Sequence, residues 1–322
     1  MRSGWIGLWV AVATASCDAG TSRPGEPPGT TGAASTNTSP AVATATPILA
    51  DVLRLAGGAD RFLVTPRWSP DGRRLLASGR GGVGLWIVDP ASGTTRLADP
   101  DCRGPAFWSH DGATVACPAG DTTSGWLVHD LAGGIDRVTA RPAFVPATIP
   151  AGDVPADAEV LFEAEGRRVT YEEYRGRLEA WEGEDHRVLA GEDAAGPRAS
   201  PDGSRVAWWT GPLLDPTLHV SGLDGREIFA GPGAHAAWLP DGESLVYAVP
   251  RAGAGPDGAP RVAASELRLL DLRDASSTDL TATPEAVEMQ PAVAPDGRRL
   301  AFADWASGEI RLGRLAPARG AP

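Results

Sequence analysis

The stretch RWSPDGRRLLA, residues 67–77, combines an aromatic residue, a turn and an apolar run. Within it, Ser69-Pro70-Asp71-Gly72 matches a type I turn. Proline fixes φ at the first central position, aspartate accepts bonds from nearby backbone amides, and glycine accepts the positive φ that ends the turn. Trp68 before the turn and Leu75-Leu76 after it are then the flanking strands, so the stretch predicts a β-hairpin.

The same pattern recurs along the chain. Its plain further copies are Trp108-Ser109-His110-Asp111-Gly112, Ala199-Ser200-Pro201-Asp202-Gly203, Trp238-Leu239-Pro240-Asp241-Gly242 and Val293-Ala294-Pro295-Asp296-Gly297. We expect a degenerate sixth copy at residues 155–162, which share the shape of residues 295–302. Measured at positions 70, 110, 155, 201, 240 and 295, the spacings are 40, 45, 46, 39 and 55 residues. Such a period, roughly 40 to 50 residues, is typical of four-stranded propeller blades.

Each repeat predicts a strand, the Asp-Gly turn, a second strand, a variable loop, a third strand, a short turn and a fourth strand. The last repeat lacks a fourth strand, and residues 52–55, just before the first repeat, have the right length to supply it. With 40 Gly, 29 Pro and only two Met, we expect almost no helix. The fold class is therefore all-β: a six-bladed β-propeller of four-stranded antiparallel blades, its ring closed by an N-terminal strand.

The first fifty residues differ from the repeats. Arg2 and an apolar run over residues 5–15 lead to Cys17, a pattern typical of a secretory signal peptide and too short to span a bilayer. The residues after it are rich in Ser, Thr, Pro, Gly and Ala, which predicts a disordered tether. The expected division is a signal peptide (1–17), a tether (18–49), a propeller (50–316) and a tail (317–322).

The chain is acidic, with 29 basic and 41 acidic residues and a formal net charge of −12. Proteins that bind nucleic acid present a basic face to the phosphate backbone, so we expect no nucleic-acid partner. We also expect a monomer.

Two cysteines, Cys102 and Cys117, flank the turn of the second repeat. Folding that hairpin places Cys117 opposite Gly104, about two residues from Cys102. In an oxidising compartment a diagonal approach allows a disulfide; the alternative is two separate thiols, with Cys117 in a blade core.

The repeat of an aromatic residue, Ser-Pro-Asp-Gly and an apolar run, followed by an apolar third strand ending in Asp, resembles the WD-like propeller repeat of the TolB family. The resemblance covers about residues 50–315 and implies a six-bladed propeller that binds proteins in the bacterial envelope. TolB itself carries an α/β domain before its propeller, where this chain has a tether. The N-terminal segment resembles a bacterial lipoprotein signal, which implies lipidation of Cys17; Thr14 stands where that family has leucine, and an ordinary cleaved signal is the alternative.

The sequence lacks the common motifs of catalytic and phosphate-binding sites. It has no Gly-x-Ser-x-Gly elbow, Cys-x-x-Cys pair or phosphate loop, so we expect no catalytic residue, cofactor or metal. The repeated aspartates are explained by bonds to the turn backbone. The five histidines, scattered over different repeats, are His110, His129, His186, His219 and His235.

Partner binding is expected where the repeat varies, on the loops between second and third strands. These loops are residues 78–84, 118–124, 210–216, 249–265 and 303–308. The candidate rim residues on them are Arg80, Asp121, Asp215, Arg251, Asp257, Arg261 and Trp305. The alternative for the longest loop, residues 249–265, is a tolerated surface insertion.

We therefore expect a non-catalytic scaffold of the cell envelope, periplasmic or extracellular, that meets the membrane only through a lipid on Cys17. Its partner is expected to be an envelope protein or a peptidoglycan-associated molecule. The alternative is a propeller enzyme, a lyase or hydrolase acting on polysaccharide, as in oligogalacturonate-lyase-like propellers that bind metal through histidines from several blades.

Overall fold

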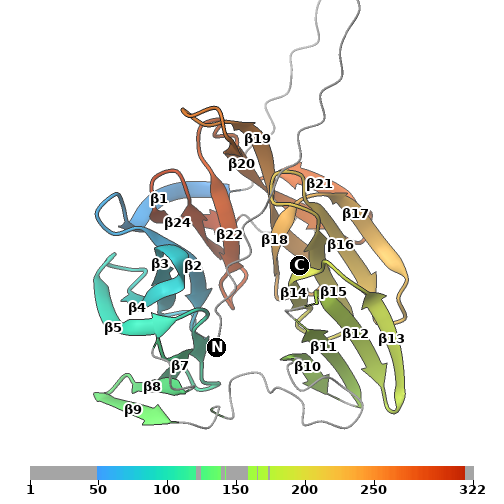
Figure 1. Ribbon diagram of the computed structural model, residues 1–322, viewed down its shortest axis with the longest axis horizontal. Coiled ribbons are helices and arrows are strands. Elements are labelled where there is room, and N and C mark those ends of the chain that lie inside the picture. The colour runs from blue at the N-terminus through green and yellow to red at the C-terminus, as the bar shows by residue number, and fades with distance from the viewer. Residues whose placement is uncertain are drawn as a thin grey trace, which may run out of the picture. The chain divides into compact units, whose positions relative to one another are not determined.

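The computed structural model describes residues 49–120, 125–138, 142, 159–164, 166–172 and 175–315. These residues form six four-stranded antiparallel sheets arranged around a common centre (Figure 1). Among them, the only helical element is the 3₁₀ turn η1 (Arg80–Gly82), and no helix is long and apolar enough to cross a membrane. The expected six-bladed, all-β propeller is confirmed.

Each sheet is one blade, with strands following one another outward from the centre. Blade 1 contains β2 (Leu63–Trp68), β3 (Leu75–Gly79), β4 (Val83–Val88) and β5 (Thr95–Arg103). Blade 2 contains β6 (Phe107–Trp108), β7 (Thr114–Pro118), β8 (Trp126–Asp130) and β9 (Gly134–Val138). Blade 3 contains β10 (Glu159–Ala164), β11 (Arg167–Glu172), β12 (Arg177–Glu182) and β13 (Asp185–Ala190).

The remaining blades follow the same order, except that the last one borrows its outer strand. Blade 4 contains β14 (Ala195–Ala199), β15 (Arg205–Thr210), β16 (Thr217–Gly222) and β17 (Glu227–Pro232). Blade 5 contains β18 (Ala234–Trp238), β19 (Ser244–Ala254), β20 (Pro260–Asp271) and β21 (Ser276–Asp279). Blade 6 contains β22 (Glu288–Val293), β23 (Arg299–Asp304), β24 (Glu309–Leu315) and β1 (Leu49–Gly57).

The ring is closed by β1, which pairs antiparallel with β24 from Leu49↔Leu315 to Gly57↔Glu309. The first strand of the propeller thus completes the last blade, which confirms the role predicted for residues 52–55. Leu55 of β1 is buried against Leu63 and Trp68 of blade 1. Pairing with β1 covers the outer edge of β24, and because β1 leads directly into blade 1, it also fastens blade 6 to blade 1.

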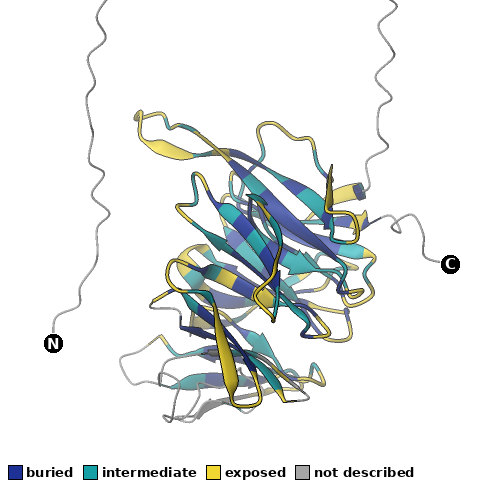
Figure 2. Ribbon diagram, turned by 90° about the vertical axis from the view of Figure 1, so that its right-hand side faces the viewer, coloured by how far each residue is buried: buried dark blue, intermediate teal, exposed yellow. Residues whose placement is uncertain are grey.

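Apolar side chains join the blades to one another. Within the described residues, hydrophobic clusters link blade 1 to blades 2 and 6, blade 5 to blades 4 and 6, and blade 3 to blade 4. Buried segments fill the middle of the sheets, whereas the turns and the far end of the β19–β20 hairpin are exposed (Figure 2).

The Asp-Gly turns are held by the bonds that the sequence predicts. In blade 1, Ser69 Oγ donates to Asp71 Oδ1 at 2.6 Å, and the same oxygen accepts from the backbone N of Arg73 at 2.9 Å. Blades 2 and 4 repeat this arrangement. The turn aspartates are therefore structural, as expected, and the Ser69 hydroxyl and these backbone amides hold the pKa of Asp71 below its usual value.

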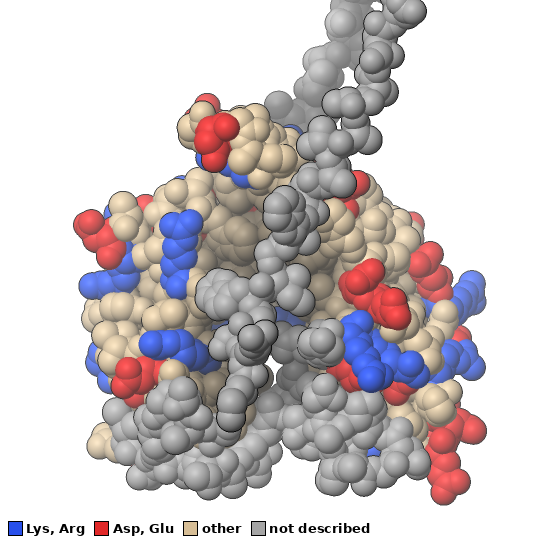
Figure 3. All heavy atoms as spheres, viewed as in Figure 1, with Lys and Arg blue, Asp and Glu red and all other residues tan. Residues whose placement is uncertain are grey.

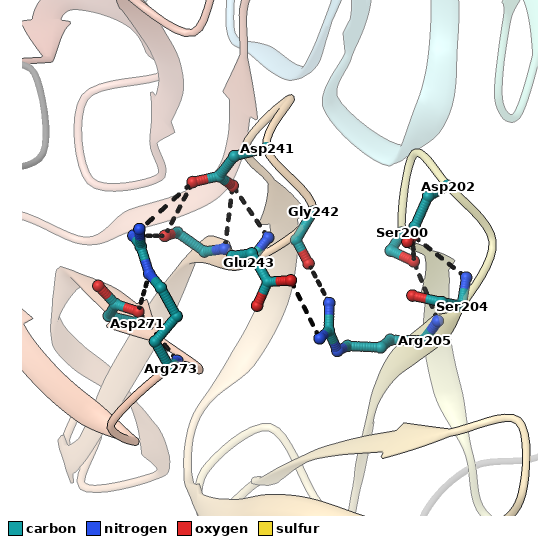
Figure 4. A network of polar contacts seen from close by, with 10 residues as sticks. Ser200, Asp202, Ser204, Arg205, Asp241, Gly242, Glu243, Asp271 and Arg273 are labelled. Atoms are coloured by element: carbon teal, nitrogen blue, oxygen red, sulfur yellow. Dashed lines mark hydrogen bonds and ion pairs between the residues drawn. The ribbon is translucent and has the colours of Figure 1, made fainter. Parts of the chain in front are cut away.

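The turns also contact the neighbouring blade. Arg205 Nη1 of blade 4 donates to the carbonyl O of Gly242 in blade 5 at 2.8 Å, and Arg299 Nη2 of blade 6 donates to that of Gly72 at 3.0 Å (Figure 4 shows the first). Gly297 has a φ of +67°, and a Cβ there would lie 3.3 Å from Cδ of Pro240. Glycine is needed in the turn both for its φ and for this close approach.

The repeat tryptophans form a second type of contact between blades. The indole Nε1 of Trp68 donates to the carbonyl O of Ala292 at 2.9 Å, and that of Trp238 to Arg198 O at 2.9 Å. Trp108 donates in the same way to Arg67 O at 3.2 Å. In every case the acceptor lies in the preceding blade, so these tryptophans join neighbouring blades by hydrogen bonds.

The structure corrects the register of the third repeat. Residues 155–158 lie outside the described residues, and β10, at Glu159–Ala164, is the first strand of blade 3 rather than the second. Its turn ends at Gly166, which has a φ of +76°. The blade count is unaffected, but the turn carries neither the Pro nor the Asp of the other copies, so the match at residues 155–162 was shifted by one strand.

The segment 249–265 is not a loop. It extends β19 and β20 into a long hairpin, with pairs from Val249↔Glu266 to Ala254↔Pro260 and a tight turn in which Gly258 N donates to Gly255 O at 2.9 Å. Because the segment is rich in Gly, Ala and Pro, its sequence predicted a loop rather than paired strands. The backbone ladder, rather than side-chain patterning, holds the hairpin together.

Replacing Trp68 by Phe should lower the free energy of unfolding by about 1 kcal/mol more than replacing Trp209 by Phe, because only Trp68 loses an inter-blade hydrogen bond. Trp209 is a matched control, since among the described residues its buried Nε1 has no hydrogen-bond partner. Denaturant titration followed by circular dichroism measures both variants. Equal losses would contradict a role for the Trp68 N–H.

Candidate functional site

The inner strands of four blades carry a bulge at the same place. Register shifts interrupt β2, β14, β18 and β22 three residues before the aromatic position of the repeat. The residues at these bulges are Thr65, Gly196, His235 and Gln290, with φ values of 50°, 53°, 53° and 53°. A positive φ is strained for any residue except glycine, and for β-branched Thr65 in particular. Such strain clusters at functional sites.

Two cavities occupy the centre of the ring next to these bulges. The first, which we call the channel mouth, has a volume of about 550 Å³. It is lined by Phe62, Val64, Thr65, Arg67, Leu76, Ser78, Arg80, Gly81, Gly82, Gly104, Pro105, Ala106, Gln290 and Trp305. The second, of about 650 Å³, lies among the inner strands and the Asp-Gly turns and shares Thr65, Arg67 and Gln290 with the first.

Gln290 ties the bulges to the channel mouth. Its Oε1 accepts from the backbone N of Thr65 at 2.9 Å and from Trp305 Nε1 at 3.3 Å. One side chain thus links blade 6 to blade 1 and to the loop after β23. The bonds fix the orientation of the Trp305 ring at the cavity wall.

His235 lies between two tryptophan rings, with centroid distances of 5.7 Å to Trp209 and 5.9 Å to Trp305. Its Nε2 is buried and has no hydrogen-bond partner among the described residues. Burial, assisted by the charge of Arg198, lowers the pKa of His235 to about 4. The imidazole is therefore neutral at neutral pH, and it lines the second cavity.

The channel mouth is basic. Its lining, as far as the described residues form it, includes Arg67 and Arg80 but no Asp or Glu, although acidic residues outnumber basic ones in the chain by 41 to 29. The Arg80 guanidinium lies 5.2 Å from the Phe62 ring centroid and, within the described part of the chain, pairs with no carboxylate. Over the outer parts of the blades, by contrast, charges of both signs are interspersed (Figure 3).

The candidate rim residues are not brought together by the structure. Arg80 and Trp305 line the channel mouth. Asp215, Arg251, Asp257 and Arg261 are exposed elsewhere, with Arg251 Nη2 paired to Glu266 Oε1 at 2.9 Å. Asp121 lies outside the described residues, as does Cys17. The predicted rim therefore contributes two of its seven residues to the cavity.

Sequence reasoning did not predict that the bulge residues Thr65, His235 and Gln290 would line the cavities, because turn and strand patterns point to the loops as the variable positions. Their common offset within the repeat, three residues before Trp68, Trp238 and Val293, was the available signal.

The two cysteines form a disulfide between Cys102 and Cys117, with a Cα–Cα distance of 5.7 Å. Cys102 pairs with Ala119 in an isolated bridge, so Cys117 lies diagonally across from it. The bridge Cys102↔Ala119 has the register expected from Cys117 opposite Gly104, whereas the pair Phe107↔Ala116 is shifted by two residues, so the chain bulges between residues 102 and 107. The expected diagonal approach of the two cysteines is confirmed.

A set of metal-ligand side chains converging in the central channel would favour a metal-dependent enzyme. Among the described residues, one group of three or more His, Cys, Asp or Glu side chains lies close enough to share an ion, and it consists of Cys102, Cys117 and His129. This group belongs to the packing between blades 1 and 2 rather than to either central cavity.

No protein-family model and no curated protein matches the chain. The WD40 repeats of RRP9 superpose with a TM-score of 0.58 at 11% identity, covering 82% of this chain and 97% of that one. A protein from Agrobacterium tumefaciens assigned as TolB gives 0.49 at 16% identity, covering 81% and 92%. Oligogalacturonate lyase in complex with manganese gives 0.40 at 16% identity, covering 83% and 94%. At such identities the likeness shows the propeller fold alone.

Stability should depend on pH through His235. Histidine in an unfolded chain has a pKa of about 6.5, and in the folded protein that of His235 falls to about 4. Between these pH values only the unfolded chain takes up the proton, so stability should fall as the pH is lowered, by at most about 3 kcal/mol. Denaturant titrations from pH 7 to pH 4 measure this loss.

His235→Gln should remove that part of the pH dependence. Trp209→Phe alters a ring beside His235 without removing a titrating group, so it should shift stability alike at every pH. An unchanged pH profile in His235→Gln would refute the assignment.

Proposed function

We propose that this protein binds, without chemistry of its own, an anionic segment of a cell-envelope partner at the channel mouth. The observation that supports this proposal is a cavity of about 550 Å³ in which Arg80 pairs with no carboxylate of the described residues and the described lining includes no acidic side chain, in a chain of net charge −12. Cavities of this size accommodate a short chain segment or a small molecule.

The lining suits a segment that carries both a carboxylate and an apolar side chain. Phe62, Val64 and Trp305 supply the apolar wall. Arg80 is oriented by its ring contact with Phe62 and offers its donors to a carboxylate, a geometry that favours bidentate hydrogen bonding. A Cβ at Gly81 would meet nothing within 4 Å, so a ligand can approach the backbone beside Arg80.

The proposal of binding without catalysis rests on the types of side chain in the cavity. The residues that the structure describes in the lining include no Asp, Glu, Cys or His, and the one serine among them, Ser78, is buried. General acid–base or nucleophilic catalysis needs a paired base close to the reacting group. The channel mouth offers charge and shape complementarity instead.

The cellular setting is supported by the sequence. The TolB-like repeat and the lipoprotein-like segment ending at Cys17 favour a monomeric propeller in the bacterial envelope, periplasmic or extracellular, attached to the membrane by the lipid alone. Residues 18–48 would act as the tether, since Leu49 is the first residue of β1. The partner would then be an envelope protein or a peptidoglycan-associated molecule.

A second candidate function is favoured by the same arginines. Carboxylates recur along a polyuronate chain, so the channel mouth also suits an enzyme that cleaves such a polysaccharide. Incubation of the protein with uronate polymers, followed by detection of new unsaturated or reducing ends, distinguishes the two candidates. Turnover by the wild type that is lost in Arg80→Gln would replace the binding proposal with the enzymatic one.

Arg80→Gln should lower the recovery of the envelope partner about tenfold or more, because the substitution removes the charge that pairs with the carboxylate. Arg73→Gln is the matched control, since Arg73 is exposed on the Asp-Gly turn and does not line the cavity. Photo-crosslinking from position 81 in intact envelopes, with quantified products, measures recovery. Equal crosslinking by both variants would refute the site.

Cys17→Ser should release the protein from the membrane fraction into the soluble fraction, because the lipid would be its only membrane attachment. Fractionation and immunoblotting of cells that express each form measure the distribution. A membrane-bound Cys17→Ser variant would exclude lipidation as the anchor while leaving the binding site open to its own test.

A further inference from the structure

Four potential metal ligands are buried together where blade 1 meets blade 2. Asp99 and Cys102 lie on β5, Cys117 on β7 and His129 on β8. Their exposed fractions are 7%, 2%, 0% and 4%, so the group is almost completely shielded from solvent. Leu85, Val115 and Leu127 belong to the surrounding apolar cluster.

The ligand atoms converge on one point. His129 Nε2 lies 3.4 Å from Asp99 Oδ2 and 4.0 Å from Cys102 Sγ. One ligand atom from each of Cys102, Cys117 and His129 lies within 4.8 Å of the others. In tetrahedral zinc sites, with bonds of about 2.0 to 2.3 Å, neighbouring ligand atoms are about 3.4 to 3.8 Å apart. The two contacts of His129 Nε2 are close to that range. The two sulfur atoms are bonded to each other, so they reach it only after the disulfide is reduced and the thiolates separate.

We propose that the reduced form of this cluster is a site for a zinc-class divalent cation, bound by Cys102, Cys117 and His129 with Asp99 as the fourth ligand. The disulfide is then the metal-free state of the same site. Two thiolates, an imidazole and a carboxylate are the donor types that zinc prefers, and four protein ligands make a closed, structural site.

A disulfide alone does not account for the polar half of the cluster. Burying a carboxylate and an imidazole costs free energy unless both are well paired. Asp99 accepts from the backbone N of Asp101 at 2.7 Å, but its contact with His129 is long for a hydrogen bond, at 3.4 Å. Metal coordination by both groups would offset this cost.

The metal-bound thiolate form and the disulfide form interconvert by thiol–disulfide exchange, in which all atoms and electrons are accounted for. A disulfide of another molecule, R–S–S–R, accepts the two electrons of the zinc-bound thiolates. Its S–S bond breaks, a bond forms between Cys102 Sγ and Cys117 Sγ, the partner leaves as two thiolates, and the metal ion dissociates. Reduction by a dithiol reverses the exchange and restores the ligands.

The test uses the full chain, reduced and freed of reductant under oxygen-free conditions, and Co²⁺ as a spectroscopic probe for Zn²⁺. We expect the reduced protein to bind one equivalent, with thiolate-to-cobalt charge-transfer bands that Zn²⁺ displaces, and the oxidised protein to bind none. Cys102→Ser should abolish the bands, and His129→Gln and Asp99→Asn should each weaken binding about tenfold or more. His219→Gln, at an unrelated histidine paired with Glu227, should bind as the wild type does.

Thermal melting provides a readout that does not depend on whether the reduced protein stays folded. Zn²⁺ should raise the melting temperature of the reduced wild type, or restore its folded circular-dichroism spectrum, and should do neither for Cys102→Ser. The proposal is overturned if the reduced wild type gains neither charge-transfer bands nor thermal stability. It is equally overturned if the oxidised protein binds Co²⁺ as tightly as the reduced one.

Discussion

The hydrogen bond from a repeat tryptophan to the backbone of the preceding blade is the contact on which the ring depends. It joins residues that are about forty positions apart or more: Trp68 donates to Ala292, Trp108 to Arg67 and Trp238 to Arg198. Each indole buries apolar area and satisfies a carbonyl at the same time. Because the acceptor directly precedes the aromatic position of its own repeat, one sequence motif supplies both sides of the contact.

This constraint explains why the best-conserved feature among the repeats carries no chemistry. Ser69 and Asp71 are occupied by bonds within the turn, and Gly297 of blade 6 is required where Pro240 of the blade 5 turn approaches. Any substitution that freed these groups for a ligand would weaken a turn or a blade interface. The residue type differs among the repeats three positions before the aromatic position, where the inner strand bulges. Thr65, His235 and Gln290 occupy this position and line the central cavities.

Sequence patterns within one repeat predicted the features that depend on residues close together in the chain. The Asp-Gly hairpins, the blade count and the closing strand at residues 52–55 follow from turn chemistry and strand length, and the structure confirms them. The third repeat was misplaced by a strand because its turn has neither Pro nor Asp, and residues 249–265 looked like a loop because Gly and Ala give no alternation. The channel mouth could not be predicted, since it combines Phe62, Arg80 and Trp305 only once the ring closes.

The channel mouth and the cysteine–histidine cluster differ in whether they depend on closure of the ring. The channel mouth uses blades 1 and 6, and Gln290 holds them together by accepting from Thr65 and Trp305, so it exists only in the closed ring. The cluster of Cys102, Cys117 and His129 lies in the packing of blades 1 and 2, and its disulfide crosslinks only fifteen residues of chain. By loop entropy, a crosslink of this length contributes about 3 kcal/mol, against about 4.7 kcal/mol for a loop of a hundred residues. The disulfide therefore stabilises the packing of blades 1 and 2 without joining distant blades, and this stabilisation by itself does not explain the buried His–Asp pair beside the sulfur atoms.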